Sequence, residues 1–287
     1  MVTDTEIKHQ VREFYNQVGW QEASDGFYQN ASYEDLRPVA HDYIHACHLR
    51  VLRHLNPGGH LLLDAGSGPI QYPEYLEYSK GYQHRVCADI SFVALQEARK
   101  RIGMHGFFVV CDIANLPFPS NSFDGMVSLH TIHHVPPDEH IRAYQELHRT
   151  IRPAGKGVIV NGWDNPILTV FMNFWISLIG RLYALSRSQP TVVDRGQASC
   201  SPTHASPVRG TYVRKHNAAW LHKEVGELMP IKIWCWRSVS VRFLRTFIHE
   251  RFAGRWLLKA IYWLEERFPH FFGMVGQYPL IELNKHL

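Results

Sequence analysis

Short apolar runs alternate with helical segments between residues 60 and 163, and this alternation constrains the fold more than any other feature. Five runs have the length and residue types of buried strands: 60–66, 84–91, 106–113, 123–132 and 155–163. Three helical segments lie between them: 72–81, 92–103 and 138–153. Strands and helices that alternate in this way build a parallel, doubly wound sheet. Ligands of such sheets bind outside the carboxyl ends of the strands.

The first strand runs into a glycine loop, Asp64-Ala65-Gly66-Ser67-Gly68-Pro69. Glycine permits positive φ and a close approach of the backbone to a ligand. A dinucleotide fingerprint would place a third glycine at position 71, where this chain has Gln71. A pyrophosphate also needs a loop that leads into a helix N-terminus, and Pro69-Ile70 leaves little of that cradle. These features disfavour a nicotinamide dinucleotide and a dehydrogenase.

Polar residues also follow the next three strands. Asp89 ends the second strand, where a carboxylate can accept both hydroxyls of a ribose. Asp112 follows the third strand, where an acid beside a backbone N–H can read the amino edge of adenine. The fourth strand ends in SLHTIHHV (128–135), which contains three histidines. In this order, the four strand ends indicate a ligand with one adenine and one ribose.

The chain from about residue 60 to 163 resembles the class I S-adenosylmethionine-dependent methyltransferases. The resemblance rests on LLLDAGSGP, VCADIS, CDIANLPFPSNSFDGMVSLHTIHHV and ELHRTIRPAGKGVIV, the last with Ala154 where glycine is usual. The segment GQYPLIELNK resembles the last antiparallel strand of that fold. The resemblance implies an α/β, Rossmann-like, doubly wound and mostly parallel seven-stranded sheet. N-terminal helices and a helical lid inserted after strand five complete the expected fold.

The resemblance also implies the cofactor S-adenosyl-L-methionine, with S-adenosyl-L-homocysteine as product. No metal is expected, because zinc would need further ligands beside His130, His133 and His134. The residues expected to contact the cofactor all follow strands: Asp64, Gly66, Ser67, Gly68 and Pro69 at its methionine part, Asp89 and Ile90 at its ribose and adenine, Asp112 and Ile113 at its adenine, and Leu129 and His130 beside it.

A hydroxyl acceptor must lose a proton, and histidine suits that task because its pKa lies near neutrality. TIHHVP resembles the double-histidine stretch of small-molecule and sugar O-methyltransferases, in which one histidine is the base. We expect His133 to be the base and His134 to be a second candidate, unless His134 only bonds nearby backbone. The expected substrate contacts are Tyr15, Tyr28, Arg37, Trp163, Asp164, Arg209, Tyr212 and Arg214.

The chain divides into four expected regions: an N-terminal helical cap (1–56), the cofactor-binding core (57–163), a substrate lid (164–230) and a C-terminal part that completes the sheet (231–287). A loop rich in Ser and Pro (186–211) is expected to be mobile within the lid. The apolar run 166–185 approaches the roughly 20 residues of a membrane span. We expect a cap helix or a surface-lying helix there, because a span would interrupt the fold.

The net charge of +4 hides a basic segment, since residues 181–259 contain 14 Lys and Arg against 4 Asp and Glu. This balance of +10 leaves −6 for the rest of the chain and suits phosphate, anionic lipid or nucleic acid. Two alternatives therefore accompany the small-molecule O-methyltransferase. One is a C-methyltransferase of a quinone or lipid-like acceptor at a membrane surface. The other is a tRNA wobble-uridine methyltransferase, disfavoured because the basic residues are interleaved with Trp and Leu.

The cellular location is expected to be cytoplasmic. The five cysteines form no CxxC pair, which disfavours a disulfide framework and a zinc site. The first 20 residues are polar and charged, without the apolar stretch of a secretory signal.

Overall fold

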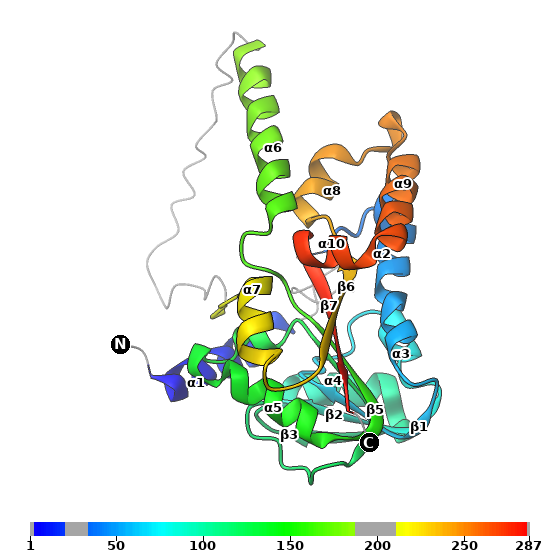
Figure 1. The fold of residues 1–287 in the computed structure, drawn as a ribbon, viewed down its shortest axis with the longest axis vertical. Coiled ribbons are helices and arrows are strands. Elements are labelled where there is room, and N and C mark those ends of the chain that lie inside the picture. Colours follow the sequence, from blue (N-terminus) through cyan, green and yellow to red (C-terminus); the bar gives the residue numbers. More distant parts are fainter. Residues whose placement is uncertain (1–2, 21–33, 187–210, 286–287) are drawn as a thin grey trace, which may run out of the picture.

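The computed structural model describes residues 3–20, 34–186 and 211–285, and it contains one seven-stranded sheet (Figure 1). The strands lie in the order β3-β2-β1-β4-β5-β7-β6. Strands β1 to β5 are parallel, and β7 is antiparallel to both of its neighbours. The strand bounds are β1 Gly59–Ala65, β2 Tyr82–Asp89, β3 Gly106–Val110, β4 Phe123–Leu129, β5 Ile151–Val160, β6 Ile231–Arg237 and β7 Tyr278–Asn284. The predicted mostly parallel, doubly wound sheet is confirmed.

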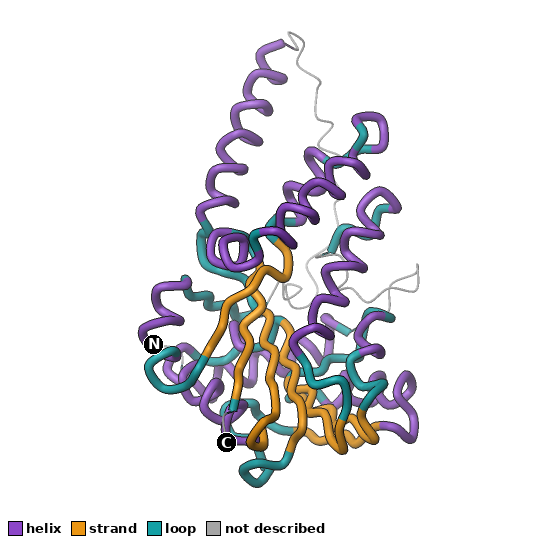
Figure 2. Tube along the Cα trace, turned by 45° about the vertical axis from the view of Figure 1, so that its right-hand side comes forward, coloured by secondary structure: helices purple, strands orange, loops and turns teal. Residues whose placement is uncertain are grey.

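Helices cover both faces of the sheet and extend beyond one end of it (Figure 2). Their bounds are α1 Asp4–Phe14, α2 Pro38–Leu49, α3 Glu74–Glu77, α4 Phe92–Ile102, α5 His140–Thr150, α6 Ile167–Ser186, α7 Ala218–Trp220, α8 Val241–Phe247, α9 Gly254–Arg267 and α10 Pro269–Val275. Strand β6 ends at Arg237, and helix α8 begins soon after it because Ser240 caps α8 by accepting from the N–H of Phe243. Within the described part of the chain, no helix meets the length and hydropathy needed to cross a bilayer.

The core is divided between the two faces of the sheet. On one face, Leu63, Met126 and Ile159 pack against α5. On the other face, Leu62, Val127 and Val158 pack with residues of α4. A third cluster joins α2, α8 and α9 at the helical end, apart from the sheet. The helices that extend beyond the sheet therefore have a core of their own.

Three buried ion pairs tie distant segments together. Arg85 of β2 binds Asp64 of β1 at 2.5 Å. Arg237 at the end of β6 binds Glu34 at 2.6 Å. Arg50, which follows α2, binds Glu265 of α9 at 2.9 Å. Removing one partner of a buried pair costs about 3–5 kcal/mol, because the other charge is left without compensation.

Six described residues other than glycine have positive φ, and two of them lie at positions that the sequence comparison with the family singles out. Ile70, in the loop after β1, has a φ of 56° and is fully buried. Ala154, where the resemblance has glycine, has a φ of 64°. A branched residue at positive φ is strained, because its Cβ crowds the backbone. The carbonyl of Ile70 accepts a hydrogen bond of 2.8 Å from Arg101, which holds the loop in place.

We predict that Ile70→Gly is more stable than Ile70→Ala by about 1 kcal/mol, because glycine has no Cβ to oppose positive φ. Both variants lose a buried side chain, which costs about 2–5 kcal/mol. At Ile44, which is buried in helix α2, the order should reverse by about the same amount. Urea unfolding of the four variants measures both differences. The same ranking at both sites would contradict strain at Ile70.

Candidate active site

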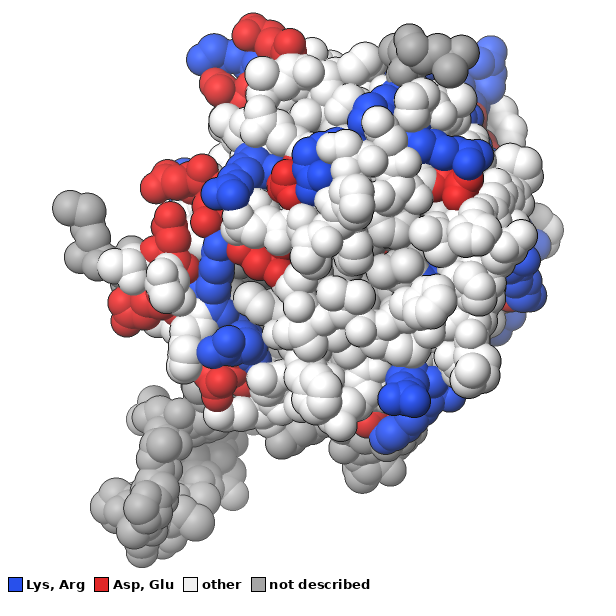
Figure 3. Space-filling model, turned by 90° about the horizontal axis from the view of Figure 1, so that it is seen from below, with Lys and Arg blue, Asp and Glu red and all other residues white. Residues whose placement is uncertain are grey.

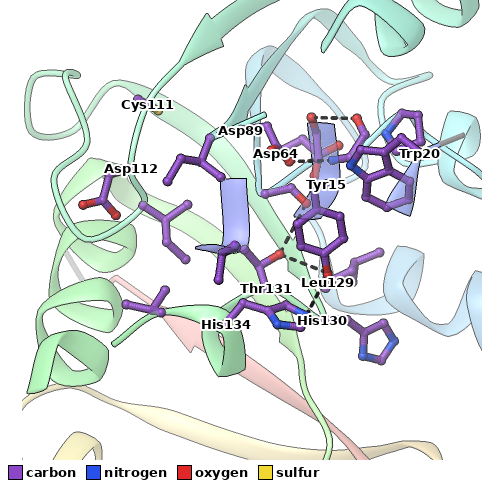
Figure 4. Close-up of a pocket in the computed structure, with 18 of the residues that line it drawn as sticks. Tyr15, Trp20, Asp64, Asp89, Cys111, Asp112, Leu129, His130, Thr131 and His134 are labelled. Carbon is purple, nitrogen blue, oxygen red and sulfur yellow. Dashed lines mark hydrogen bonds between the residues drawn. The ribbon is translucent and has the colours of Figure 1, made fainter. Parts of the chain in front are cut away.

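A cavity of about 140 Å³ lies at the carboxyl ends of the parallel strands, and α1 contributes to its lining. Figure 4 shows Asp112 toward one end of the cavity, His130 toward the other and Asp89 between them. All eleven residues predicted to contact the cofactor line this cavity: Asp64, Gly66, Ser67, Gly68, Pro69, Asp89, Ile90, Asp112, Ile113, Leu129 and His130. Sequence reasoning thus selected residues that the fold brings together.

The turns after β1 and β4 meet at Gly66. Gly66 has a φ of 72°, and a Cβ there would lie 2.1 Å from the Cγ2 of Thr131. Thr131 donates its hydroxyl hydrogen to the carbonyl of Leu129 at 3.0 Å. Gly68 also has positive φ, and a Cβ there would lie 3.1 Å from Trp20. Side chains are therefore excluded at Gly66 by a rigid neighbour and disfavoured at Gly68.

Asp64 already has a partner on the neighbouring strand. The Nη2 and Nε of Arg85 both donate to its Oδ2, at 2.5 and 3.1 Å. Burial nevertheless raises the pKa of Asp64, with Arg85 opposing the shift. Asp64 lies where the sequence predicted, but much of its charge is balanced within the protein. Less of that charge is available to a ligand ammonium group.

Asp89 is a buried carboxylate with capacity to spare. Its Oδ2 accepts from the N–H of Gly68 at 2.9 Å, and its Oδ1 accepts from the N–H of Ser91 at 2.8 Å. A carboxylate has about four acceptor positions, so Asp89 keeps acceptor capacity for a ligand. Burial raises the pKa of Asp89 to about 6, although hydrogen bonds from backbone N–H groups, first those of Ser91 and Gly68, oppose this. The arrangement fits the two hydroxyls of one ribose.

Lys8 of α1 joins the N-terminal helix to the rim of the cavity. Its Nζ lies 2.6 Å from Asp112 and 2.5 Å from Glu139. Burial raises the pKa of Asp112, but hydrogen bonds from Lys8 and from the N–H of Ala114 outweigh burial and lower it. These ion pairs hold α1 beside the end of the cavity that contains Asp112.

The three histidines after β4 have different environments. The Nδ1 of His134 donates to the carbonyl of Tyr212 at 2.7 Å, so its Nε2 accepts from the hydroxyl of Tyr15 at 2.9 Å. His133 has its Nδ1 3.4 Å from the Oδ1 of Asn161. His130 has a φ of 56°, which is a strained conformation typical of functional sites.

Desolvation keeps all three imidazoles neutral at pH 7. Burial lowers the pKa of His130 to about 3 and that of His134 to about 4. It lowers the pKa of His133 well below its ordinary value. In a neutral imidazole, one ring nitrogen carries a hydrogen and the other has a free lone pair. Each of these histidines can therefore accept a proton if the second nitrogen is not already in a hydrogen bond.

A second cavity, of about 360 Å³, adjoins the first and shares Tyr15, Gln71, Tyr75, His130 and His134 with it. The other lining residues are Phe14, Glu34, Tyr72, His133, Gly162, Thr211, Val213, Lys215, Trp236, Arg237 and Tyr278. Aromatic rings, three histidines and two cations thus surround a space next to the cofactor cavity.

The residues predicted to contact the substrate fall into four groups. Tyr15 lines both cavities, whereas Tyr212 lines neither and accepts a hydrogen bond from His134 through its carbonyl. Trp163 and Arg214 line a small neighbouring cavity, and Asp164 is exposed beside it. Arg37 lines neither main cavity, because it binds Asp35 at 2.7 Å and the carbonyl of Leu244. Tyr28, Arg209 and most of the loop 186–211 lie outside the described residues.

Sequence reasoning missed several lining residues: Lys8, Val11, Trp20, Arg85, Cys111 and Thr131. For Thr131 the sequence does carry a signal, because it lies inside the histidine stretch 128–135 at the end of the fourth strand. Lys8, Val11 and Trp20 reach the cavity from the N-terminal segment, far from the core in sequence.

Comparisons with known proteins agree with this geometry. A family model described as a methyltransferase domain matches residues 63–159, from β1 to β5. A DhpI complex with S-adenosylhomocysteine aligns over 99% of both chains, with a TM-score of 0.57 and 12% identity. Residues 63–159 are thus a methyltransferase domain of the class I S-adenosylmethionine-dependent type. Its cofactor is S-adenosylmethionine, and its product is S-adenosylhomocysteine.

Other solved structures share this methyltransferase fold. Geranyl diphosphate C-methyltransferase from Streptomyces coelicolor A3(2) has a TM-score of 0.54 and 15% identity, and the alignment covers 97% of this chain and 98% of that one. The [4+2]-cyclase SpnF has a TM-score of 0.51 and 17% identity, with 94% and 87% covered. At these identities the likeness shows the fold alone. No curated protein sequence matches this methyltransferase significantly.

We predict that S-adenosylhomocysteine binds about tenfold more weakly at pH 5 than at pH 7, because Asp89, with a pKa of about 6, loses acceptor capacity when protonated. The pKa values of His130 and His134 lie near 3 and 4, so neither histidine titrates in this window. Titration calorimetry across this range measures the effect. Asp89→Asn should bind more weakly at pH 7 and lose the pH dependence. A flat wild-type profile would overturn the assignment.

Proposed function

We propose that this methyltransferase transfers a methyl group to a hydroxyl of a small-molecule metabolite, with a histidine as general base. The observation that carries the proposal is the second cavity, because it adjoins the cofactor cavity and is lined by His130, His133 and His134. Bound S-adenosylmethionine supplies an electrophilic methyl group on its sulfonium. The remaining tasks of the protein are to position the acceptor and to remove its proton.

His133 is the base in this proposal. If its Nδ1–H donates to Asn161, its Nε2 keeps the lone pair that a base needs. The acceptor proton moves to Nε2, and the Oδ1 of Asn161 stabilises the positive ring that results. In His134, by contrast, both ring nitrogens already form hydrogen bonds, one with Tyr212 and one with Tyr15. We therefore assign His134 the role of positioning Tyr15 at the boundary of the two cavities.

Lys215 is the cation that we propose for a polar or anionic group of the acceptor. It lines the second cavity, and burial lowers its pKa. Arg237 lines the same cavity, but its charge is balanced by Glu34 and it packs over the rings of Trp236 and Tyr278. Among the described residues Lys215 forms no ion pair of this kind, although the carboxylate of Asp164 is near enough to oppose the lowering of its pKa. Its charge is therefore the one available to a ligand.

A second candidate function is C-methylation of a lipid-like acceptor. Aromatic residues form much of the wall of the second cavity: Phe14, Tyr15, Tyr72, Tyr75, Trp236 and Tyr278. One structural neighbour is named as a C-methyltransferase of geranyl diphosphate, a small molecule with an apolar chain and a charged group. This candidate needs no hydroxyl on the acceptor.

The proposal predicts that methyl-labelled S-adenosylmethionine, incubated with the protein and a small-molecule extract, yields a labelled methoxy group. Carbon NMR separates methoxy, N-methyl and C-methyl products. In His133→Ala, kcat for that acceptor should fall about 10²–10⁴-fold, while S-adenosylhomocysteine binding stays unchanged. The exposed His41 provides a matched control, since His41→Ala should change neither. A C-methyl product would favour the second candidate, and full turnover in His133→Ala would refute the base.

We predict that Lys215→Met raises KM for the acceptor about tenfold or more, because a hydrogen bond to a charged group contributes about 1.5–3 kcal/mol. The effect on kcat and on S-adenosylhomocysteine binding should be small. Lys223→Met is the control, because Lys223 lies on the surface outside both cavities. Steady-state kinetics with the identified acceptor measures both variants. An unchanged KM in Lys215→Met would remove Lys215 from the acceptor site.

A further inference from the structure

Helix α6 presents an apolar stripe to solvent. Its members recur at intervals of three and four residues, so they lie on one side of the helix. Between 44% and 74% of each residue is exposed: Ile167, Val170, Phe171, Phe174 and Trp175. Met172 on another side packs against the core of the helical end. Over residues 167–177 the helix thus uses one side for the fold, and the described residues leave its aromatic side exposed.

Helix α9 is turned so that apolar residues face outward. Trp256 is 72% exposed and Trp263 is 63% exposed, with Leu257 and Leu264 beside them on the same side. The opposite side is buried and includes Leu258 and also the carboxylate of Glu265. An ordinary surface helix places its large apolar residues inward. This helix does the reverse with its two tryptophans.

The rotation of α9 is fixed by the hydrogen bonds of Glu265. Its carboxylate accepts from the hydroxyl of Tyr43 at 2.7 Å and from the Nη1 of Arg50 at 2.9 Å. It also accepts from the backbone N–H of Ser238 at 2.8 Å. Turning the tryptophans inward would break these bonds and expose the core of the helical end. The outward stripe is therefore a built feature of the fold.

Positive charge lies beside the exposed aromatic residues of α9 and its C-terminal end. Residues 241–268 contain six Lys and Arg against three acids, and two of the acids bind Arg50 and Arg53 on the inner side. The Nζ of Lys259 lies 4.9 Å from the ring centre of Trp256. The guanidinium of Arg267 lies 5.3 Å from that of Phe268. The outward charge is thus mainly cationic and lies beside the rings.

Helices α6, α8 and α9 all project from the same end of the molecule, beyond the sheet (Figures 1 and 2). The view from below shows a different face, on which acidic and basic side chains lie side by side (Figure 3). We refer to the outward residues of α6 and α9 together as the helical-end surface, because both helices lie at this end of the molecule. It is distinguished by exposed aromatic rings and cations together.

We propose that the helical-end surface docks on an anionic lipid bilayer. Tryptophan and phenylalanine on one side of a helix, with lysine and arginine beside them, match the interfacial region of a membrane. Lys and Arg can keep their charges at the headgroups while their stems cover apolar surface. The two stripes lie on separate helices. A broad, fluid lipid surface can contact both helices at once more easily than a single pocket of a partner protein can. The proposal does not depend on which acceptor is methylated.

The experiment is flotation of the full chain with vesicles. Vesicles of equal parts phosphatidylglycerol and phosphatidylcholine should carry the protein, and phosphatidylcholine alone should carry much less. The double variant Trp256→Ser/Trp263→Ser should lose at least tenfold in binding. The double variant Lys259→Glu/Arg267→Glu should bind anionic vesicles more weakly than wild type, by about fivefold for each of the two cations that it loses. Phe107→Ser is the control, because Phe107 is 52% exposed on edge strand β3 and should bind as wild type.

Three results would overturn the proposal: no flotation of the wild type, equal flotation of wild type and both double variants, or equal loss in Phe107→Ser. Light scattering tests the competing occupant, because a dimer that the tryptophan variant abolishes, without vesicle binding, would assign the surface to a second copy. Quenching of wild-type tryptophan fluorescence by brominated lipid needs no variant. It should occur with anionic vesicles, and its absence would also overturn the proposal.

Discussion

The contact between Gly66 and Thr131 is the constraint on which the site depends. Strands β1 and β4 are neighbours in the sheet, so the turns that follow them must share one small space. They do so because residue 66 has no Cβ and takes positive φ. The N–H of Gly68 then points at Asp89 at the end of β2. Three strand ends are thereby fixed relative to one another, and the histidines after β4 lie beside the cavity as a result.

Desolvation alone shifts the pKa values of the carboxyl and imidazole groups of the site in opposite directions. Burial raises the pKa of Asp89 because its charged form is the anion, and it lowers the pKa of His134 because its charged form is the cation. The pKa of the Asp89 carboxyl group therefore lies close to neutral pH, while the imidazoles stay uncharged at pH 7. Asp112 departs from this pattern because Lys8 of α1 and the N–H of Ala114 donate hydrogen bonds that outweigh burial and lower its pKa.

The sequence predicted the cavity well because parallel strands bring their carboxyl ends to one edge. Asp64, Asp89 and Asp112 could be placed together from strand order alone. Their partners could not be predicted, because Arg85 and Lys8 reach them through side-chain directions and helix docking that no motif encodes. The same limit explains α9, whose amphipathic pattern was visible in the sequence. Which side faces inward depends on the contacts of Glu265 with residues far along the chain.

Helix α9 exposes two tryptophans and buries a carboxylate, an orientation that selection for stability alone would not favour. A buried ion pair such as Arg50–Glu265 must offset the desolvation of both charges, and well-packed apolar residues at such sites are often as stable or more so. Two exposed tryptophans forgo the stabilisation that burial of large rings provides. A helix chosen for stability would therefore bury its rings and expose its carboxylate. Because α9 does the opposite on both counts, its outward side is better explained by contact with something outside the chain than by folding.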